Sequence, residues 1–405
     1  MYSIKIGILK EGKIPIDNRV PLTPSDAQLL KIKYPEIDIC CQASQIRCFN
    51  DEEYENAGIE IVDDLSSCDL ILGIKEVSLK DLIPQKTYMF FSHTIKKQPY
   101  NRKLIQEIVK KRITLIDYEC LTNQIGQRIL AFGRFAGIVG AYNSILIIGK
   151  KFNYFNLKLA HKCFDYSDMQ KEYLKVKLPP VKIVLTGRGK VGKGVIEVLE
   201  GMSIRRVDHQ EFIYKEFNYP VYIRIIHQDY NERIDGLKFE KEDFYSNPTK
   251  YRSKFLKYAH SADILIAGAF WDPKAPPLFQ RKDILDDEFK IKVVADITCD
   301  INGSIPSTKR SSSIDDPVYD YNANDDKVYP PFTNEHYITV MAVDNLPSEL
   351  PVDASKYFSN ILSTEVLPNY IKIDRQGIIS GATITKNGEL TANFKYLRDY
   401  VGSLE

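Results

Sequence analysis

A glycine-rich loop near the middle of the chain constrains the fold more than any other feature. Residues 181–199 read VKIVLTGRGKVGKGVIEVL, an apolar run followed by a glycine loop and a helical pattern. Gly187, Gly189 and Gly192 have the G-x-G-x-x-G spacing, which allows a tight turn, close approach of a pyrophosphate and close packing of helix on strand. The helix N-terminus adds free N–H groups and a positive dipole end. The pattern predicts a nicotinamide dinucleotide site, although the spacing also fits an ordinary strand-to-helix turn.

The choice of dinucleotide depends on residues beyond the loop. An acid that holds the ribose 2′-hydroxyl is expected about 20 residues further on, where the chain has Asp208. Arg205 and Arg206 precede it and Arg188 lies in the loop, and arginines there can accept a 2′-phosphate instead. The sequence leaves NAD and NADP open, with a slight preference for NADP.

Two later acids complete the predicted cofactor site. Asp296 ends the apolar run at 291–296, and Asp300 follows four residues later. These acids either line the nicotinamide pocket or cap the following loop. The predicted cofactor-binding residues are Gly187, Arg188, Gly189, Lys190, Val191, Gly192, Asp208, Asp296 and Asp300.

Bulk properties narrow the class of protein. A chain of 405 residues with 44% hydrophobic and 27% charged residues fits two globular domains. A net charge of +1 gives no case for nucleic acid or an acidic membrane surface. The N-terminus reads as a strand rather than a signal peptide, and no apolar stretch is long enough to span a membrane. Seven scattered cysteines without C-x-x-C spacing predict buried thiols in a reducing cytoplasm and no metal site.

Alternating apolar runs and helical patterns predict an α/β class fold of two Rossmann-like domains with parallel sheets and an inter-domain cleft. Residues 1–133 plus 345–405 form the expected substrate and catalytic domain, and residues 134–344 the NAD(P)-binding domain. The segment 211–260 is expected to be an insertion and 307–326 a loop. The expected strands are 4–9, 37–41, 70–74, 87–91, 114–117, 263–267 and 291–296, and the expected helices 25–32, 101–111, 136–148 and 355–369.

Lys75 and His93 are the candidate acid–base pair. Each directly follows an expected strand, at the carboxyl end where open α/β sheets place their ligands. A lysine acts near neutrality only if its pKa falls several units below about 10.4, which burial beside cations achieves. The alternative is a surface lysine and a structural histidine at a strand end.

Arginines near the same edge indicate an anionic substrate. Arg19 lies among apolar and proline residues in NRVPLTP, and Arg128 lies in GQRILAFGRFAG. A guanidinium group binds a carboxylate through two hydrogen bonds, and Lys96 and Gln98 add donors to the His93 loop. The pattern favours a substrate with more than one carboxylate, although each arginine alone also fits a surface ion pair.

Several longer strings carry a family resemblance. NRVPLTP, LGIKE, FFSHTIKKQ, LIDYE and GQRILAFGRFAG resemble the N-terminal half of the saccharopine dehydrogenases, relatives of alanine dehydrogenase and the transhydrogenase α subunit. VVADITCDINGSI, DDPVYDY and VDNLPSELPVDAS extend the resemblance over nearly the whole chain. With FYSNPTKYRSKF and FWDPKAPPL, the chain most closely resembles the lysine–2-oxoglutarate reductase half of bifunctional aminoadipic semialdehyde synthases, and it ends where those proteins would continue into a second activity.

The resemblance implies an oxidoreductase of lysine metabolism. In that family lysine, 2-oxoglutarate and NAD(P)H combine through an imine to give saccharopine, NAD(P)+ and water. The resemblance implies that His93 exchanges the proton of the secondary amine and that Lys75 serves carbinolamine formation and imine hydrolysis. The positions that match substrate-contacting or lysine-tuning residues are Arg19, Gln98, Arg128, Phe132, Glu76 and Glu119.

Two other classes remain open. One is a smaller amino-acid dehydrogenase such as alanine dehydrogenase, which shares the lysine and the histidine. The other is a non-catalytic NAD(P)-binding protein, which would have no need of both Lys75 and His93. The direction of the reaction and the oligomeric state are not predicted.

Overall fold

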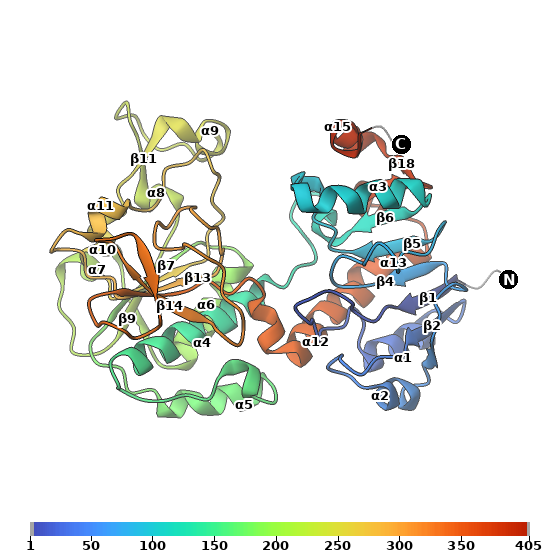
Figure 1. Cartoon of the computed structure of the whole chain (residues 1–405), viewed down its shortest axis with the longest axis horizontal. Coiled ribbons are helices and arrows are strands. Elements are labelled where there is room, and N and C mark those ends of the chain that lie inside the picture. Colours follow the sequence, from blue (N-terminus) through green and yellow to red (C-terminus); the bar gives the residue numbers. More distant parts are fainter. Residues whose placement is uncertain (1–3, 403–405) are drawn as a thin grey trace. The chain divides into compact units, whose positions relative to one another are not determined.

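A computed structural model describes residues 4–402, and the chain forms two compact units (Figure 1). The first unit combines the chain up to Phe132 with the chain from Pro351 onward, and the second is Gly133–Leu350. The boundaries expected from the sequence lay at 133/134 and 344/345.

The first unit is built on one mixed sheet. Within residues 4–402 it has eight strands in the order β18-β17-β6-β5-β4-β1-β2-β3. Strands β1 to β6 are parallel to one another, and β17 pairs antiparallel with both β6 and β18. The carboxyl ends of the six parallel strands therefore share one edge. The strands are β1 (Ile4–Ile8), β2 (Ile37–Gln42), β3 (Glu60–Val62), β4 (Leu70–Leu72), β5 (Thr87–Phe90), β6 (Thr114–Asp117), β17 (Thr383–Lys386) and β18 (Glu389–Leu390).

Helix signals in the sequence explain where the helices of this unit begin. Thr23 caps α1 by accepting a hydrogen bond from the Asp26 N–H, and Pro24 occupies the first helical position. Asn50 and Glu53 form a capping box on α2. The helices are α1 (Pro24–Lys33), α2 (Asp51–Asn56), α3 (Arg102–Lys110), α12 (Pro351–Ile361), α13 (Leu367–Ile371), α14 (Ile378–Ala382) and α15 (Arg398–Val401), with a π-helical turn at Leu362–Val366.

Two serines of α12 attach the C-terminal segment to the loop that follows β1. The hydroxyl oxygens of Ser355 and Ser359 accept hydrogen bonds from the N–H groups of Val20 and Thr23, each at 2.9 Å. Both serines are fully buried. Because buried backbone donors need partners, these bonds fix the course of the loop 9–23.

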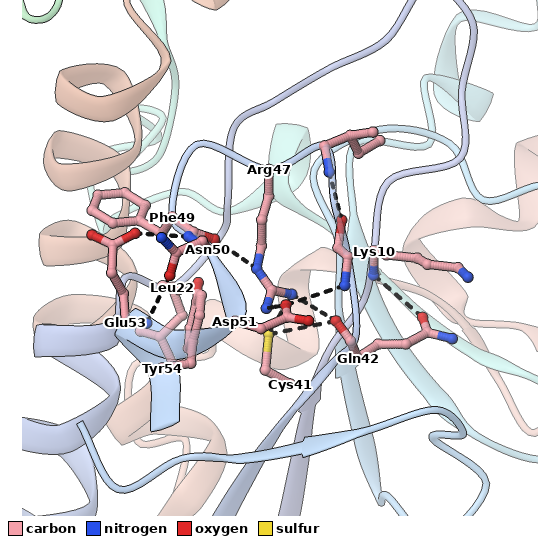
Figure 2. Close-up of polar contacts among 12 residues, drawn as sticks. Lys10, Leu22, Cys41, Gln42, Arg47, Phe49, Asn50, Asp51, Glu53 and Tyr54 are labelled. Atoms are coloured by element: carbon pink, nitrogen blue, oxygen red, sulfur yellow. Dashed lines mark hydrogen bonds and ion pairs between the residues drawn. The ribbon is translucent and has the colours of Figure 1, made fainter. Parts of the chain in front are cut away.

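Arg47 ties the end of β2 to the start of α2 (Figure 2). Its guanidinium group pairs with Asp51 and donates to the carbonyl oxygens of Gln42 and Phe49 at 2.6 and 2.7 Å. The side chain of Gln42 in turn accepts from the N–H of Lys10 at 3.3 Å. Arg47 therefore has a structural role, because it holds the strand end that flanks the loop after β1.

The second unit repeats the mixed-sheet plan. Within the described chain its sheet has eight strands in the order β15-β14-β16-β13-β12-β7-β9-β8. Strand β14 pairs antiparallel with both β16 and β15, and the other pairs are parallel. Its strands are β7 (Lys182–Thr186), β8 (Arg205–Arg206), β9 (Val221–Ile225), β12 (Ile264–Ala267), β13 (Val293–Asp296), β14 (Val318–Asn322), β15 (Lys327–Tyr329) and β16 (Ile338–Met341).

Glycines let the two longest helices of this unit pack backbone to backbone. A Cβ on Gly137 of α4 would lie 2.0 Å from the Val191 carbonyl oxygen, and one on Gly194 of α6 would lie 2.0 Å from the Arg134 carbonyl oxygen. The helices are α4 (Gly133–Lys151), α5 (Tyr166–Lys171), α6 (Lys190–Gly201), α7 (His209–Tyr214), α10 (Leu256–Ala259) and α11 (Arg281–Ile284).

Two sequence expectations for this unit are wrong. The segment 211–260 is not one insertion, because it contains β9, which pairs with β7 in the middle of the sheet. The segment 307–326, expected to be a loop, contains β14, whose first four residues are buried. The part that lies outside the sheet begins after β9 and comprises α8 (His227–Tyr230), β10 (Asn231–Arg233), α9 (Lys241–Ser246) and β11 (Tyr251–Ser253).

Short 3-10 turns link these elements. They are Thr94–Lys96, Pro99–Asn101, Tyr118–Cys120, Ala160–Lys162, Glu172–Lys175, Pro248–Lys250, Leu346–Glu349 and Ala392–Leu397. Of the helices between residues 4 and 402, none has the length and apolar character needed to span a bilayer.

Candidate active site

Glu76 joins His93 to a lysine at the carboxyl edge of the first sheet. Its Oε1 lies 2.7 Å from His93 Nδ1, and its Oε2 lies 2.5 Å from Lys13 Nζ. Burial would raise the pKa of Glu76, but the hydrogen bonds from His93 and Lys13 outweigh it and lower the pKa to about 2. Glu76 is therefore a carboxylate at neutral pH, and it fixes one ring nitrogen of His93.

The backbone presents His93 directly after β5. His93 adopts a left-handed conformation with φ of 53°, which turns the chain sharply at the strand end. Its ring stacks on Phe91 with a centroid distance of 6.1 Å, and about a quarter of the side chain is exposed. With Nδ1 held by Glu76, Nε2 is the ring nitrogen left to exchange a proton.

A second carboxylate of the same edge pairs with two cations. Glu119 Oε1 lies 2.8 Å from Arg128 NH2 and 3.5 Å from Lys96 Nζ. Burial raises the pKa of Glu119, but Lys96, Arg128 and His93 lower it further, so the net shift is downward. Its Oε2 is buried and has no hydrogen-bond partner within residues 4–402, so it can accept a hydrogen bond from a ligand.

Glu11 holds the backbone on which Lys75 stands. Its carboxyl oxygens accept hydrogen bonds from the N–H groups of Ile74 and Lys75 at 2.6 and 3.0 Å. Burial raises the pKa of Glu11 to about 7 despite these bonds. Lys75, Glu76 and Glu11 line a pocket of about 260 Å³ within the first unit. The site therefore combines a poised carboxyl group with a lysine and a cavity.

Asp117 accepts hydrogen bonds from the loop that carries His93 and from Glu119. Its Oδ2 accepts from the N–H and the hydroxyl of Ser92, and its Oδ1 accepts from the Glu119 N–H at 2.7 Å. Because Ser92 precedes His93, one buried aspartate positions both the histidine and Glu119. Burial raises the pKa of Asp117.

Arg19 lies buried in an ion pair with a carboxylate of its own unit. Arg19 is 3% exposed and forms a two-point ion pair with Asp17, at 2.9 Å from Nε and 2.5 Å from NH2. Its guanidinium carbon lies 4.0 Å from the ring centroid of Phe132, which itself stacks on Phe358 at 4.5 Å. A carboxylate of the chain itself thus explains why an arginine lies in this apolar sequence.

The remaining predicted substrate position, Gln98, lies at the start of a 3-10 turn. Its side-chain oxygen accepts from the Tyr100 hydroxyl at 2.5 Å, and its carbonyl oxygen accepts from the Tyr400 hydroxyl. Glu76 is therefore bonded to His93 and Glu119 to Arg128, whereas Gln98 is bonded to Tyr100 and Tyr400.

The glycine loop of the second unit has the geometry that a pyrophosphate requires. Gly187 has φ of +103°, and a Cβ there would lie 2.8 Å from the Gly268 carbonyl oxygen, so only glycine fits. A Cβ on Gly192 would lie 2.6 Å from the Gly187 carbonyl oxygen. A Cβ on Gly189 would meet nothing within 4 Å, so this residue faces open space at the N-terminus of α6. The loop residues therefore fit a dinucleotide, with Lys190 and Val191 in the first turn of the helix.

Asp208 does not lie where the sequence rule for the ribose placed it. It follows the edge strand β8 and caps α7 by accepting from the Glu211 N–H at 2.9 Å. The strand beside β7 is β9, so the chain reaches the position next to the glycine loop about 20 residues later than expected. The residues at that strand end are Ile226 and His227.

The acids after β13 belong to the loop that follows. Asp296 is 1% exposed, and its oxygens accept from the N–H groups of Thr298 and Cys299 and from the hydroxyls of Thr298 and Thr308. Its carboxylate therefore caps the following loop, the alternative that the sequence also allowed, and its place in a nicotinamide pocket stays a prediction. Asp300 lies in the same loop, where its carbonyl oxygen accepts from the Gly303 N–H at 2.9 Å.

Sequence reasoning missed three residues of the first unit. Glu11 and Lys13 follow the carboxyl end of β1 in KEGK, and Asp117 ends β6. The rule that singled out Lys75 and His93, a polar residue just past a parallel strand, applies equally to them.

Comparison with known proteins supports the fold. Residues 7–139 match the family model described as Alanine dehydrogenase/PNT, N-terminal domain. Solved structures agree on the fold: an L-alanine dehydrogenase covers 98% of the chain with a TM-score of 0.65 at 15% identity, and a transhydrogenase from Sinorhizobium meliloti covers 96% with 0.59 at 15%. The chain is thus an α/β protein with the alanine dehydrogenase fold.

The sequence relatives are more specific. The chain is similar in sequence to aminoadipic semialdehyde synthases and to saccharopine dehydrogenases. It is 33% identical to alpha-aminoadipic semialdehyde synthase of Arabidopsis thaliana over 97% of its length, and 29% identical to the Mus musculus mitochondrial protein over 94%. It spans 41% and 46% of those two proteins. Saccharopine dehydrogenase [NAD(+), L-lysine-forming] of Emericella nidulans is 25% identical, with 91% of this chain and 92% of that protein covered.

Proposed function

We propose that the chain interconverts lysine, 2-oxoglutarate and NAD(P)H with saccharopine, NAD(P)+ and water. The observation that carries the proposal is the set Lys13–Glu76–His93, hydrogen-bonded beside Lys75 at one strand edge. A scaffold that only bound a cofactor would have no use for a histidine held by a carboxylate next to a lysine. The sequence relatives supply the substrate class.

The chemistry of the proposed reaction divides between two bases. Lysine adds its amine to the ketone carbon of 2-oxoglutarate, the carbinolamine loses water, and the resulting imine is reduced to a secondary amine. Lys75 moves the protons of carbinolamine formation and dehydration, at the edge of the pocket that it lines. His93 exchanges the proton of the secondary amine at Nε2, because Nδ1 is engaged by Glu76.

The paired glutamates serve binding and charge. Glu119 Oε2 accepts a hydrogen bond from a substrate amine, and Arg128 and Lys96 provide positive charge for a substrate carboxylate. Arg19 acts at one remove, because its own partner is Asp17.

The glycine loop would hold the dinucleotide, which supplies hydride when bound. We infer a preference for NADP(H) over NAD(H). Arg188 is exposed in the loop and has no hydrogen bond or ion pair within residues 4–402, so its charge is available to a 2′-phosphate. The first acid after β9 is Asp229, whose carboxylate accepts from the Ile226 N–H at 2.7 Å and so does not face a ribose diol.

A steady-state assay tests the proposal and separates it from the alternatives. Consumption of reduced nicotinamide is followed with lysine plus 2-oxoglutarate, and with pyruvate plus ammonia, each with NADPH and NADH. The proposal predicts turnover with the first pair and the higher rate with NADPH. Efficient alanine formation would favour the smaller amino-acid dehydrogenase, and no turnover with either pair would favour a binding protein.

A further inference from the structure

Two buried cysteine sulfurs of the first unit are in contact. Cys40 lies in β2 and Cys68 lies just before β4, and their Sγ atoms are 3.4 Å apart. Both side chains are fully buried. In a disulfide bond the two sulfurs are about 2.05 Å apart, so a small movement of either side chain would join this pair. The proposed reaction uses neither thiol.

The contact between the sulfurs passes over β1 at Gly7. Gly7 is paired with Cys40 in the sheet, and β4 pairs with the other side of β1. A Cβ on Gly7 would lie 2.8 Å from Cys68 Sγ, which is closer than packed atoms approach. Any other residue at this position would therefore displace Cys68, so the glycine leaves open the space in which the two sulfurs meet.

The two thiols differ in acidity. The hydrogen bond with Cys68 lowers the pKa of the Cys40 thiol and outweighs the burial that raises it, and the charge of Lys5 lowers it further. The same hydrogen bond, together with burial, raises the pKa of Cys68. Because the thiolate is the form that attacks an oxidant, Cys40 is the sulfur that reacts first.

The neighbouring Cys41 is equally buried but has a different environment. Its Sγ lies 2.9 Å from Arg47 NH1 (Figure 2), and burial raises its pKa to about 12. Successive side chains of a strand face opposite sides of the sheet, so Cys41 faces away from Cys68. Cys41 is therefore a matched control for Cys40.

We propose that Cys40 and Cys68 are an oxidation site, at which hydrogen peroxide converts the two thiols to a disulfide. The Cys40 thiolate attacks one peroxide oxygen, the O–O bond breaks, and the leaving hydroxide takes up the thiol proton to form water. The Cys68 sulfur then attacks the sulfenic sulfur of Cys40, and the S–O bond breaks to release a second water. The two thiols together lose two electrons and two protons, and the peroxide is reduced to two waters.

The bond would connect the two strands that flank β1. It would join β2 to the start of β4 across a separation of 28 residues, and a cross-link over such a loop restricts the unfolded chain. Because neither sulfur is exposed, a small oxidant reaches them more readily than a bulky disulfide reagent does. We therefore expect oxidation to stabilise the first unit.

Peptide mapping tests the pairing directly. The full chain is treated with hydrogen peroxide, its remaining thiols are alkylated, and it is cleaved without reduction after basic residues and glutamates. Cleavage after Arg47 and Glu60 separates Cys48 from both members of the pair. Mass spectrometry should find the peptide of Cys40 joined to that of Cys68, with the loss of two hydrogens. The joined peptides should persist in Cys41→Ala and be absent from Cys40→Ala.

Thermal denaturation gives a second readout. Peroxide should raise the melting temperature of the first unit by about 5 °C in the parent and in Cys41→Ala, and it should produce no such rise in Cys68→Ala. Absence of the joined peptides from the oxidised parent, or an equal shift in the parent and Cys68→Ala, would overturn the inference. Since the mapping needs only the parent chain, a variant that fails to fold does not protect the inference from refutation.

Discussion

The two sheets share one plan but differ in what their carboxyl edges carry. In each sheet of the described chain the first strand, β1 or β7, lies third from one edge, and an antiparallel pair closes the other edge. Each unit also has an aspartate whose Oδ2 accepts from the first strand: Asp69 from the Lys5 N–H and Asp263 from the Lys182 N–H, both at 2.8 Å.

At the carboxyl edge the resemblance between the sheets ends. The first sheet places Glu11, Lys75, Glu76 and His93 just past its strands, with charges paired across the edge. The second sheet places glycines after β7. Its acid, Asp296, caps the loop that follows β13. Under the proposed function, the first unit would carry out proton transfer and the second would let a phosphate group approach the backbone.

The largest expected effect is the loss of dinucleotide binding when Gly189 is substituted. Gly189→Val should abolish dinucleotide binding in calorimetry, because the branched side chain would fill the space that faces the helix N-terminus. Its melting temperature should change little, since a Cβ there meets no protein atom within 4 Å. Gly381→Val is the control, because Gly381 is equally open but lies in the first unit. Retained dinucleotide affinity in Gly189→Val would refute the assignment.

The next largest effect lies in the other unit. Lys75→Met and His93→Gln should each lower turnover by roughly 10²–10⁴-fold, the usual range for general acid–base catalysis. Dinucleotide affinity should stay as in the parent, because both residues belong to the first unit. Steady-state kinetics with calorimetry on the same preparations measures both quantities. Full activity in either variant would remove that residue from the mechanism.

Substitution of Arg19 tests whether this residue stabilises the first unit or binds the substrate. Arg19→Met should destabilise the first unit by about 3–5 kcal/mol, because the buried Asp17 carboxylate would lose its two-point bond to the guanidinium group. The double variant Arg19→Met/Asp17→Asn should lose less than the sum of the two single variants. Urea denaturation of the three variants measures this. Normal stability with weakened 2-oxoglutarate binding would instead show that Arg19 binds substrate directly.

A smaller effect concerns the pH dependence of stability. Glu11 has its folded pKa raised from 4.5 to about 7, so the native state binds its proton more tightly than the unfolded state. Its contribution is complete below pH 4.5 and is lost as pH rises through 7, by about 3 kcal/mol. Glu11→Gln should remove that part of the slope in denaturation curves recorded between pH 4 and pH 8. An unchanged difference between parent and variant over this range would contradict the shift.

Much of this arrangement is readable from sequence. The apolar β-branched runs predict β1, β2, β4, β5 and β6 to within two residues, because buried parallel strands need continuous apolar sequence. The polar residues that follow them predict Lys75 and His93 at one edge. Short or polar strands escape this reading, as the two-residue β8 and the Asp- and Asn-bearing β14 show.

Strand order and partner choice depend on tertiary packing. Nothing local in the sequence shows that β8 goes to the edge and β9 returns beside β7, so the sequence distance that points to Asp208 leads to the end of the edge strand. The pairing of Arg19 with Asp17 is equally invisible, because an arginine in an apolar run needs a carboxylate but the sequence does not say whose.

The most direct test of the division of work follows the hydride itself. NADPH carrying deuterium at the transferred position is mixed with the chain, lysine and 2-oxoglutarate, and the products are analysed by mass spectrometry. The account predicts saccharopine with one deuterium, formed far more slowly by His93→Gln and not at all by Gly189→Val. Deuterium in glutamate, or saccharopine labelled as fast by His93→Gln as by the parent chain, would contradict it.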